Sequence, residues 1–346
     1  MRFRKAVAAL LTIAFVAVIA TAVVTEFVKN EDKDVNAPEP LLITFWGDSI
    51  AEGVLGPSPL KERDSYAYFA IVGRDNGYIY KNRSVSGHQT SNMLEYILRP
   101  DENAYLTDTL MRTSDIIHIS ILGNDLLQNS LGAMVVNYAK GDSSSLDANI
   151  AKARSNFAEI MDHIASVNPD AFVMINTVYN PMFEGSAILP QSCIDEMHAL
   201  GMDSADIRAT GSAMLAELNG IIFDYLAEHE GAYVVIDAEA EFDRIFSEDE
   251  ERGKGLLYKD GVHPSNEGHA VIADLIQRAL EKEGLANEAT ALANYKQLRT
   301  EQLARLYAGT ADTSENRARI AGAASVEEVT YAYFRAIDGY SPVYYD

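Results

Sequence analysis

The chain has 346 residues, of which 48% are hydrophobic and 23% are charged. This composition is typical of a globular protein with a sizeable core, and it excludes disorder for most of the chain. The 28 basic and 51 acidic residues give a net charge of −23, which argues against nucleic acid as a partner and against tight docking on anionic lipid. Because Cys193 is the single cysteine, an internal disulfide and a cysteine-based zinc site are excluded.

The N-terminus has the charge pattern of an export signal. Basic residues lie within positions 2–5, and residues 6–25 carry no charge. A helix of that length, rising about 1.5 Å per residue, would span the roughly 30 Å hydrocarbon core of a bilayer. Positive charge before such a span predicts that the rest of the chain lies outside, and the small residues 20–22 also fit a signal-cleavage site. We therefore predict an exported chain, either membrane-anchored or secreted after cleavage, with residues 26–40 as a linker.

From residue 41 onward, short apolar runs alternate with longer helical patterns. The sequence predicts strands within 41–46, 77–84, 115–123, 171–181 and 232–237, and helices within 65–73, 92–99, 143–169, 213–231 and 266–284. Five strands separated by helices indicate βαβ units and a parallel sheet that is covered on both faces. The predicted fold class is therefore α/β, a three-layer α/β/α sandwich.

Several local features complete this prediction. Ser91 is predicted to cap the helix at 92–99, and the charged stretch 247–254 is predicted to be a solvated loop. The long connection 181–205 is predicted to form a lid or a binding loop. Residues 285–346 are predicted to be a helical C-terminal extension that either packs on the domain 41–284 or contacts a partner protein.

The sequence "FWGDSIAEG" at 45–53 places Ser49 directly after the first predicted strand. Ligands in open α/β sheets bind beyond the carboxyl ends of the strands, so the Ser49 hydroxyl and N–H would face a binding site. A serine hydroxyl is a weak nucleophile and needs a base. Gly-Asp-Ser alone is equally well explained as a turn.

A candidate base follows in "KDGVHPSNEGH" at 259–269. Asp260 lies three residues before His263, so its carboxylate can fold back onto one ring nitrogen and leave the other free to accept a proton. An Asp-Gly turn with a surface histidine would explain the same residues. A metal site formed by His263, Glu267 and His269 is a weaker alternative, because the spacing matches no recognised ligand pattern.

Two further strand ends carry candidate hydrogen-bond donors. Gly87 in "NRSVSGHQT" allows a backbone N–H to approach a ligand closely, and the side-chain amide of Asn124 in "ILGNDL" can donate to a developing oxyanion. A turn and a helix cap are the ordinary explanations of these two stretches. All four features nevertheless lie at the carboxyl ends of predicted strands or in the final loop, as one catalytic centre requires.

The order of these four stretches resembles the four signature blocks of the SGNH (GDSL-type) hydrolase family over residues 41–284. The resemblance implies a flavodoxin-like five-stranded sheet and a serine esterase that needs no cofactor and no metal. It assigns Ser49 as the nucleophile, His263 as the base and Asp260 as the residue that orients His263. The oxyanion hole would comprise the N–H groups of Ser49 and Gly87 and the amide of Asn124. His88 departs from the family pattern, in which a small residue is more usual, and this leaves the shape of the acyl pocket open.

The expected substrates are carboxylic esters: O-acetylated carbohydrates, small acyl esters or lysophospholipids. Transfer of an acyl group to a cell-wall sugar is an alternative activity for the same centre. A non-catalytic binding module is an alternative from a different class, in which the C-terminal helices would contact a partner. In the first two cases the partner is a small-molecule or polysaccharide ester, and the membrane is contacted through the N-terminal segment alone.

Overall fold

Five parallel strands form a sheet in the order β2-β1-β3-β4-β5. The computed structural model describes residues 40–55, 60–99, 106–286 and 288–337. The strands are β1 (Leu42–Gly47), β2 (Ile79–Asn82), β3 (Ile116–Ser120), β4 (Phe172–Asn176) and β5 (Val234–Ile236). The parallel α/β prediction is therefore confirmed, and β1 lies inside the sheet between β2 and β3.

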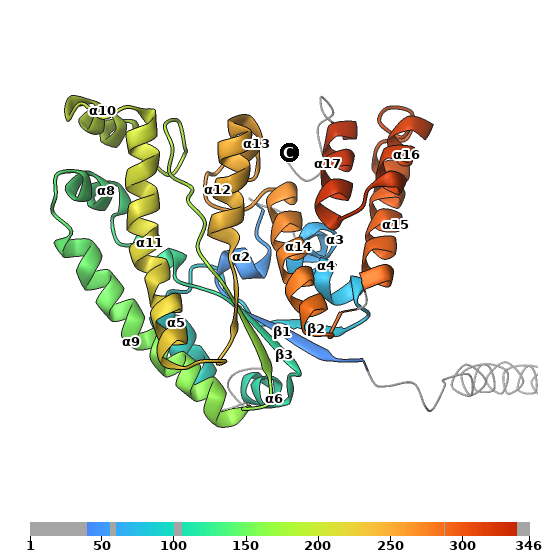
Figure 1. Cartoon of the computed structure of the whole chain (residues 1–346), viewed down its shortest axis with the longest axis horizontal. Coiled ribbons are helices and arrows are strands. Elements are labelled where there is room, and N and C mark those ends of the chain that lie inside the picture. Colours follow the sequence, from blue (N-terminus) through green and yellow to red (C-terminus); the bar gives the residue numbers. More distant parts are fainter. Residues whose placement is uncertain (1–39, 56–59, 100–105, 287, 338–346) are drawn as a thin grey trace, which may run out of the picture. The chain divides into compact units, whose positions relative to one another are not determined.

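Helices cover both faces of this sheet (Figure 1). One face packs against α5 (Thr90–Ile97), α6 (Thr107–Thr113), α7 (Gly123–Leu127), α8 (Leu131–Ala139), α9 (Ser144–Val167), α10 (Gln191–Ala199) and α11 (Ser204–Glu228). On the other side lie α2 (Ser49–Glu52), α3 (Leu60–Tyr66), α4 (Tyr68–Asp75), α12 (Ala238–Glu248) and α14 (Asn266–Lys282). The C-terminal helices α15 (Glu288–Leu306), α16 (Ser314–Gly322) and α17 (Val326–Ile337) pack against this helical layer. The short helix α13 (Glu250–Gly255) follows α12.

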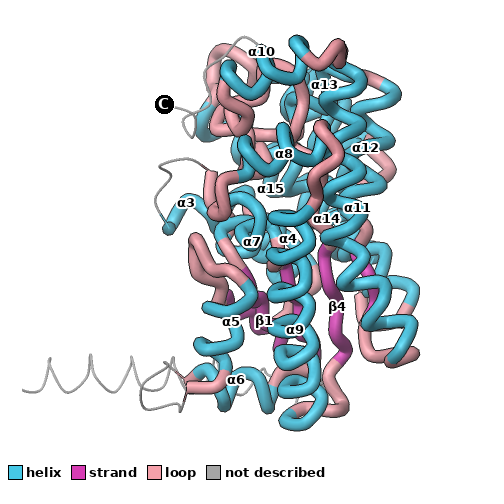
Figure 2. Tube along the Cα trace, turned by 90° about the vertical axis from the view of Figure 1, so that its left-hand side faces the viewer, coloured by secondary structure: helices cyan, strands magenta, loops and turns pink. Residues whose placement is uncertain are grey.

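Strand β1 shows how alternation divides the core into two layers. Ile43 and Phe45 belong to the apolar cluster that contains α4 and α14, whereas Trp46 belongs to the cluster that contains α5 and α9. The Trp46 indole donates to the Thr44 hydroxyl at 2.8 Å, so its buried N–H is satisfied. Figure 2 shows α5 and α9 on the near side of the sheet, close to β1 and β4. Burial on both faces fixes the direction in which β1 ends, and therefore the place of the residues that follow it.

The described helices of the C-terminal extension pack on the α/β layers, with α15 against α4 and α17 against α14. Arg299 of α15 is 1% exposed, and its guanidinium donates to the Tyr295 hydroxyl at 2.8 and 3.0 Å. The Gln302 side chain reaches the carbonyl of Ser65 at 3.3 Å, and the Tyr78 hydroxyl donates to the carbonyl of Leu285. These buried contacts join the extension to the sheet domain. Contact between the extension and another protein stays a prediction.

Two local predictions are wrong. Helix α5 begins at Thr90 and is capped by Gln89, because Gln89 and Asn92 exchange side-chain and backbone hydrogen bonds in a capping box; Ser91 lies inside the helix. The stretch 247–254 is not a loop: it contains the end of α12 and most of α13. The Asp249 side chain accepts from the N–H of Arg252 and so caps α13.

The predicted export segment, residues 6–25, and most of the linker lie outside the described residues. Within the described parts of the chain, no helix has the length and apolar character needed to cross a membrane. The N-terminal segment therefore stays a prediction.

Candidate active site

The turn after β1 requires glycine. Gly47 has φ of +140°, and a Cβ atom there would lie 1.8 Å from the carbonyl oxygen of Ser120 in the neighbouring strand. The same oxygen accepts a hydrogen bond from the N–H of Asp48 at 3.1 Å. Because β1 and β3 approach so closely, the chain can turn sharply at Gly47 and begin a helix at Ser49.

We expect Gly47→Ala to lower the free energy of unfolding by about 2 kcal/mol or more, because it combines a steric clash with an unfavourable φ. Urea unfolding measures this loss. Gly220→Ala is the matched control, since Gly220 lies in α11 without a positive φ, and a Cβ atom added there would meet nothing within 4 Å. The control is expected to be neutral or to stabilise by up to about 1 kcal/mol. Equal stability of both variants would refute the requirement for glycine at position 47.

Ser49 is the first residue of α2, a helix of only 4 residues. The first N–H groups of a helix lack intrahelical acceptors, so the Ser49 N–H can donate to a bound group. Asp48 caps the helix by accepting from the N–H of Ile50 at 2.9 Å. Burial raises the pKa of Asp48 to about 7, while the Ile50 hydrogen bond and the nearby His263 act in the opposite direction.

The predicted pair in the last loop is formed. His263 Nδ1 lies 2.8 Å from Asp260 Oδ2, and Asp260 Oδ1 accepts from the N–H groups of Val262 and His263 at 3.0 Å each. Partial burial works to raise the pKa of Asp260, but these hydrogen bonds outweigh it and the pKa is lowered. Asp260 is therefore held as a carboxylate that fixes the imidazole through Nδ1, which leaves Nε2 as the nitrogen that can accept a proton.

Ser49 and Val262, the neighbour of His263, line the same cavity. His263 is also close enough to Asp48 to lower the pKa of that carboxyl. Among the residues that the structure describes, no hydrogen bond joins the Ser49 hydroxyl to His263. Such bonds are often long in enzymes without substrate and shorten in the complex.

The two remaining predicted donors come from separate loops. The amide of Asn124, in the first turn of α7, donates to the carbonyl of His88 at 3.1 Å, so Asn124 and the loop of Gly87 are in direct contact. Gly87 has φ of +81°, a conformation that favours glycine. Leu122, just before α7, has φ of +95°, which is a strained value for leucine. Strain of this kind beside a candidate site is typical of residues that present a functional group.

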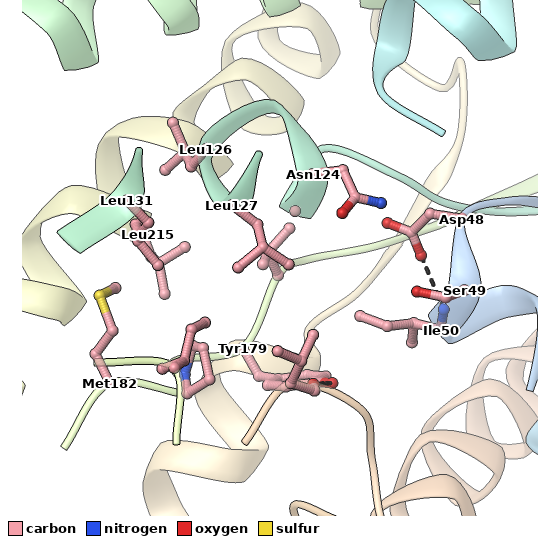
Figure 3. Close-up of a pocket in the computed structure, with 15 residues that line it drawn as sticks. Asp48, Ser49, Ile50, Asn124, Leu126, Leu127, Leu131, Tyr179, Met182 and Leu215 are labelled. Atoms are coloured by element: carbon pink, nitrogen blue, oxygen red, sulfur yellow. Dashed lines mark hydrogen bonds between the residues drawn. The ribbon is translucent and has the colours of Figure 1, made fainter. Parts of the chain in front are cut away.

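An apolar cavity leads away from Ser49. Its volume, including the part open to solvent, is about 520 Å³. Figure 3 shows Asp48, Ser49 and Asn124 at one side and aliphatic side chains at the other. The aliphatic lining away from Ser49 includes Leu126, Leu127, Leu131, Val178, Met182, Ile188 and Leu215. The sequence did not reveal this set, whose members come from α7, α8, α11, the segment after β4 and the predicted binding loop.

Pro181, Met182 and Ile188 of the predicted binding loop line this cavity, and α10 occupies much of the remainder of the loop. The loop is anchored: Asn180 donates to the carbonyl of Arg208 and the hydroxyl of Ser212. His88 does not line the cavity; its ring packs edge-on against Tyr96, with centroids 5.7 Å apart. His88, which departs from the family pattern, therefore does not determine the shape of the apolar cavity.

The residues of the alternative metal site have other contacts. Glu267 pairs with Arg252 at 2.8 Å, whereas His269 is fully buried, with its ring against Tyr66 and Tyr68. Burial lowers the pKa of His269 to about 3, so this imidazole is neutral. Neither side chain joins His263 in a common cluster.

The geometry of the site and the comparison with known proteins indicate one class of enzyme. A serine at the carboxyl edge of a five-stranded parallel sheet, with an Asp–His pair in the last loop, is typical of serine hydrolases. Residues 45–271 match the model of the GDSL-like lipase/acylhydrolase family. The chain belongs to this family and is a serine hydrolase that acts on carboxylic ester bonds.

The relatives are distant. The uncharacterized protein YpmR of Bacillus subtilis (strain 168) is 22% identical over 273 residues, which cover 75% of this chain and 89% of that protein. Phospholipase A1 from Streptomyces albidoflavus NA297 has a similar fold, with a TM-score of 0.50 and 17% identity over 69% of this chain and 99% of the other. The lipase Lip_vut3 from a goat rumen metagenome has a TM-score of 0.46 and 20% identity over 69% and 97%. At 17% identity, the likeness to the phospholipase shows the fold alone.

Proposed function

We propose that the protein hydrolyses carboxylic esters whose acyl group is an apolar chain of several carbons. The observation that carries this proposal is the aliphatic cavity beside Ser49. An acetyl group would leave most of this apolar surface in contact with water, whereas a longer chain would cover it.

The proposed chemistry begins with Ser49. Its oxygen attacks the ester carbonyl carbon while His263 Nε2 takes the hydroxyl proton. The carbonyl oxygen becomes an oxyanion, and the N–H groups of Ser49 and Gly87 and the amide of Asn124 donate to it. When the tetrahedral intermediate collapses, the C–O bond to the alcohol breaks and His263 donates its proton to the leaving oxygen. An acyl-Ser49 ester remains in the site.

Water completes the cycle. His263 takes a proton from a water molecule, whose oxygen attacks the acyl carbon, and a second tetrahedral intermediate forms. Its collapse breaks the bond to Ser49 and returns the proton to the serine oxygen. Asp260 stabilises the imidazolium that exists during both steps and holds its Nδ1–H. The products are the carboxylic acid and the alcohol.

The proposal includes export, on the evidence of the charged N-terminus followed by the apolar run 6–25. An enzyme on the outer side of the membrane would encounter lipid esters or other esters outside the cell. Proteolysis of intact cells, followed by detection of the chain, tests this placement independently of catalysis.

A series of p-nitrophenyl esters tests the substrate class. Each methylene buried in the cavity is worth about 0.8 kcal/mol, a factor of about 4, so kcat/KM is expected to rise from acetate to octanoate by at least about 10-fold. A wild-type enzyme that prefers acetate would contradict the apolar acyl chain. A wild-type enzyme that cleaves none of the esters would contradict the esterase proposal.

Leu215→Phe provides the structural test, because Leu215 is 3% exposed and lines the far side of the cavity. We expect this substitution to lower kcat/KM for octanoate by about 10-fold through loss of buried chain, and to leave acetate hydrolysis within about 2-fold. Leu200→Phe is the matched control, since Leu200 is 46% exposed and does not line the cavity. An equal loss on both esters would instead indicate damage to the fold.

A further inference from the structure

Gly87 lies in a loop in which several backbone N–H and carbonyl groups form hydrogen bonds. The Gly87 carbonyl accepts from the Gln128 side chain at 2.8 Å, and the His88 carbonyl accepts from Asn124. The His88 N–H donates to the carbonyl of Val85 at 3.1 Å. Within the described part of the chain, the Gly87 N–H has no acceptor. The loop therefore leaves one N–H available and fixes the groups around it.

Glu52 holds the residue before this glycine. One carboxylate oxygen, Oε2, accepts from the Ser86 N–H at 2.6 Å and from the Ser86 hydroxyl. The other, Oε1, accepts from Arg63 Nη1 at 2.5 Å. The side chains of Glu52 and Arg63 are 22% and 12% exposed. The carboxylate is thus bound from both sides, in a setting less solvated than that of an ordinary surface pair.

Glu52 also belongs to α2, the helix that Ser49 begins, and lies three residues after the nucleophile. One side chain therefore spans from the nucleophile helix to the loop that carries Gly87. Hydrogen bonds to an oxyanion require donors at about 2.7–3.1 Å from the position that the oxygen will occupy. Ser49 and Gly87 are 38 positions apart in the sequence. A tertiary contact is therefore needed to fix the distance between their N–H groups.

We propose that Glu52 is a positioning residue that holds the Gly87 N–H in register with the Ser49 N–H, so that both can bind the same oxyanion. This inference rests on the proposed esterase function. Arg63 supports the arrangement by fixing the second oxygen of the carboxylate. The hydrogen bond from the Ser86 N–H is charge-assisted and stronger than a neutral one, which suits a contact that must define geometry.

Three substitutions separate position from charge. Glu52→Gln keeps the side-chain length and an acceptor for Ser86 but removes the charge. Glu52→Asp keeps the charge but is one methylene shorter and withdraws from Ser86. Glu52→Ala removes both. If Glu52 acts by position, Glu52→Gln keeps kcat within about 5-fold, while Glu52→Asp and Glu52→Ala lower it by about 10- to 100-fold, a part of the 10²–10³ that loss of a whole oxyanion donor costs.

The loss is expected in kcat, with KM within about 2-fold, because the oxyanion exists in the transition state and not in the bound ester. A trifluoromethyl ketone, which binds Ser49 as a tetrahedral adduct, provides the second readout. Its inhibition constant is expected to rise by the same factor as kcat falls in each variant. If Glu52 had a purely structural role, its substitution would change thermal stability, and the inhibition constant would not rise in proportion to the fall in kcat.

Glu315→Ala is the matched control, because Glu315 pairs with Arg319 on the exposed side of α16 and lies far from Ser49 in the sequence. It is expected to keep wild-type kcat. Wild-type kcat in folded Glu52→Asp, or a larger loss in Glu52→Gln than in Glu52→Asp, would overturn the positioning role. If Glu52→Ala does not fold, the comparison of Gln with Asp still decides. Failure of the proposed function would appear earlier, as a wild-type enzyme without esterase activity.

Discussion

Replacing Ser49 with alanine is expected to lower the rate of ester hydrolysis by about 10⁴- to 10⁶-fold and to abolish labelling by a fluorophosphonate probe. The physical reason is that the acyl group has no oxygen to which it can be transferred. Ser49→Ala leaves the N–H of residue 49 in place, and Asp48 can still accept from Ile50 at the start of α2. The fold and the apolar cavity should therefore survive, and substrate should still bind.

Ser192→Ala is the control for this experiment, because Ser192 is exposed on α10 and does not line the cavity. It is expected to be labelled and to turn over substrate like the wild type. Undiminished labelling of Ser49→Ala would identify a different nucleophile. Absence of labelling in the wild type would remove the nucleophile assignment altogether and favour a binding module.

The sheet was predictable because four of its five strands are largely apolar runs near turn residues; the edge strand β2 also contains Lys81 and Asn82. In β3 all residues from Ile116 to Ser120 are buried, and the strand is rich in isoleucine although it also contains His118 and Ser120. Strand order cannot be read in that way, because periodicity reports burial and not neighbours. The observed order follows the flavodoxin-like arrangement that the resemblance implied.

The failure at 247–254 has a packing cause. The stretch is highly charged and contains Gly253, which favours the prediction of a loop. In the structure Gly253 lies so close to Phe246 that a Cβ atom would be 2.4 Å from its Cα. The helix forms because Asp249 caps it and Lys254 pairs with Glu250 at 2.9 Å. The cap and the pair are local and can be read from the sequence, whereas the close approach of Gly253 to Phe246 has no signature in composition.

In the candidate site, too, local contacts could be predicted from the sequence and long-range contacts could not. Asp260 and His263 are three residues apart, so their hydrogen bond is local and could be predicted from spacing. The proximity of Gly87 to Asn124 depends on how β2 and β3 are ordered around β1, and for these residues the prediction came from the resemblance. Glu52 was visible in "FWGDSIAEG" itself, but its partner Ser86 is 34 positions away and lies on another loop.

The second large effect is expected at His263. Removing the imidazole in His263→Ala should lower kcat by about 10⁴- to 10⁶-fold, because a neutral serine hydroxyl then attacks without a base. Asp260→Asn should cost about 10⁴-fold. Asn can still accept from the N–H groups of Val262 and His263 through one oxygen, but its NH₂ would face His263 Nδ1. This forces the imidazole proton onto Nε2, the nitrogen that must accept the serine proton.

Added imidazole distinguishes a missing base from a damaged fold. It can enter the space left by His263→Ala and restore part of the activity. It should not restore activity to Asp260→Asn, in which the native imidazole still fills the site. His229→Ala is the matched control, because His229 is exposed and stacks on Tyr225 at the end of α11. It should keep full turnover. Full ester turnover by folded His263→Ala would exclude this histidine as the base, even if Ser49 proved to be the nucleophile, because the two assignments rest on separate contacts.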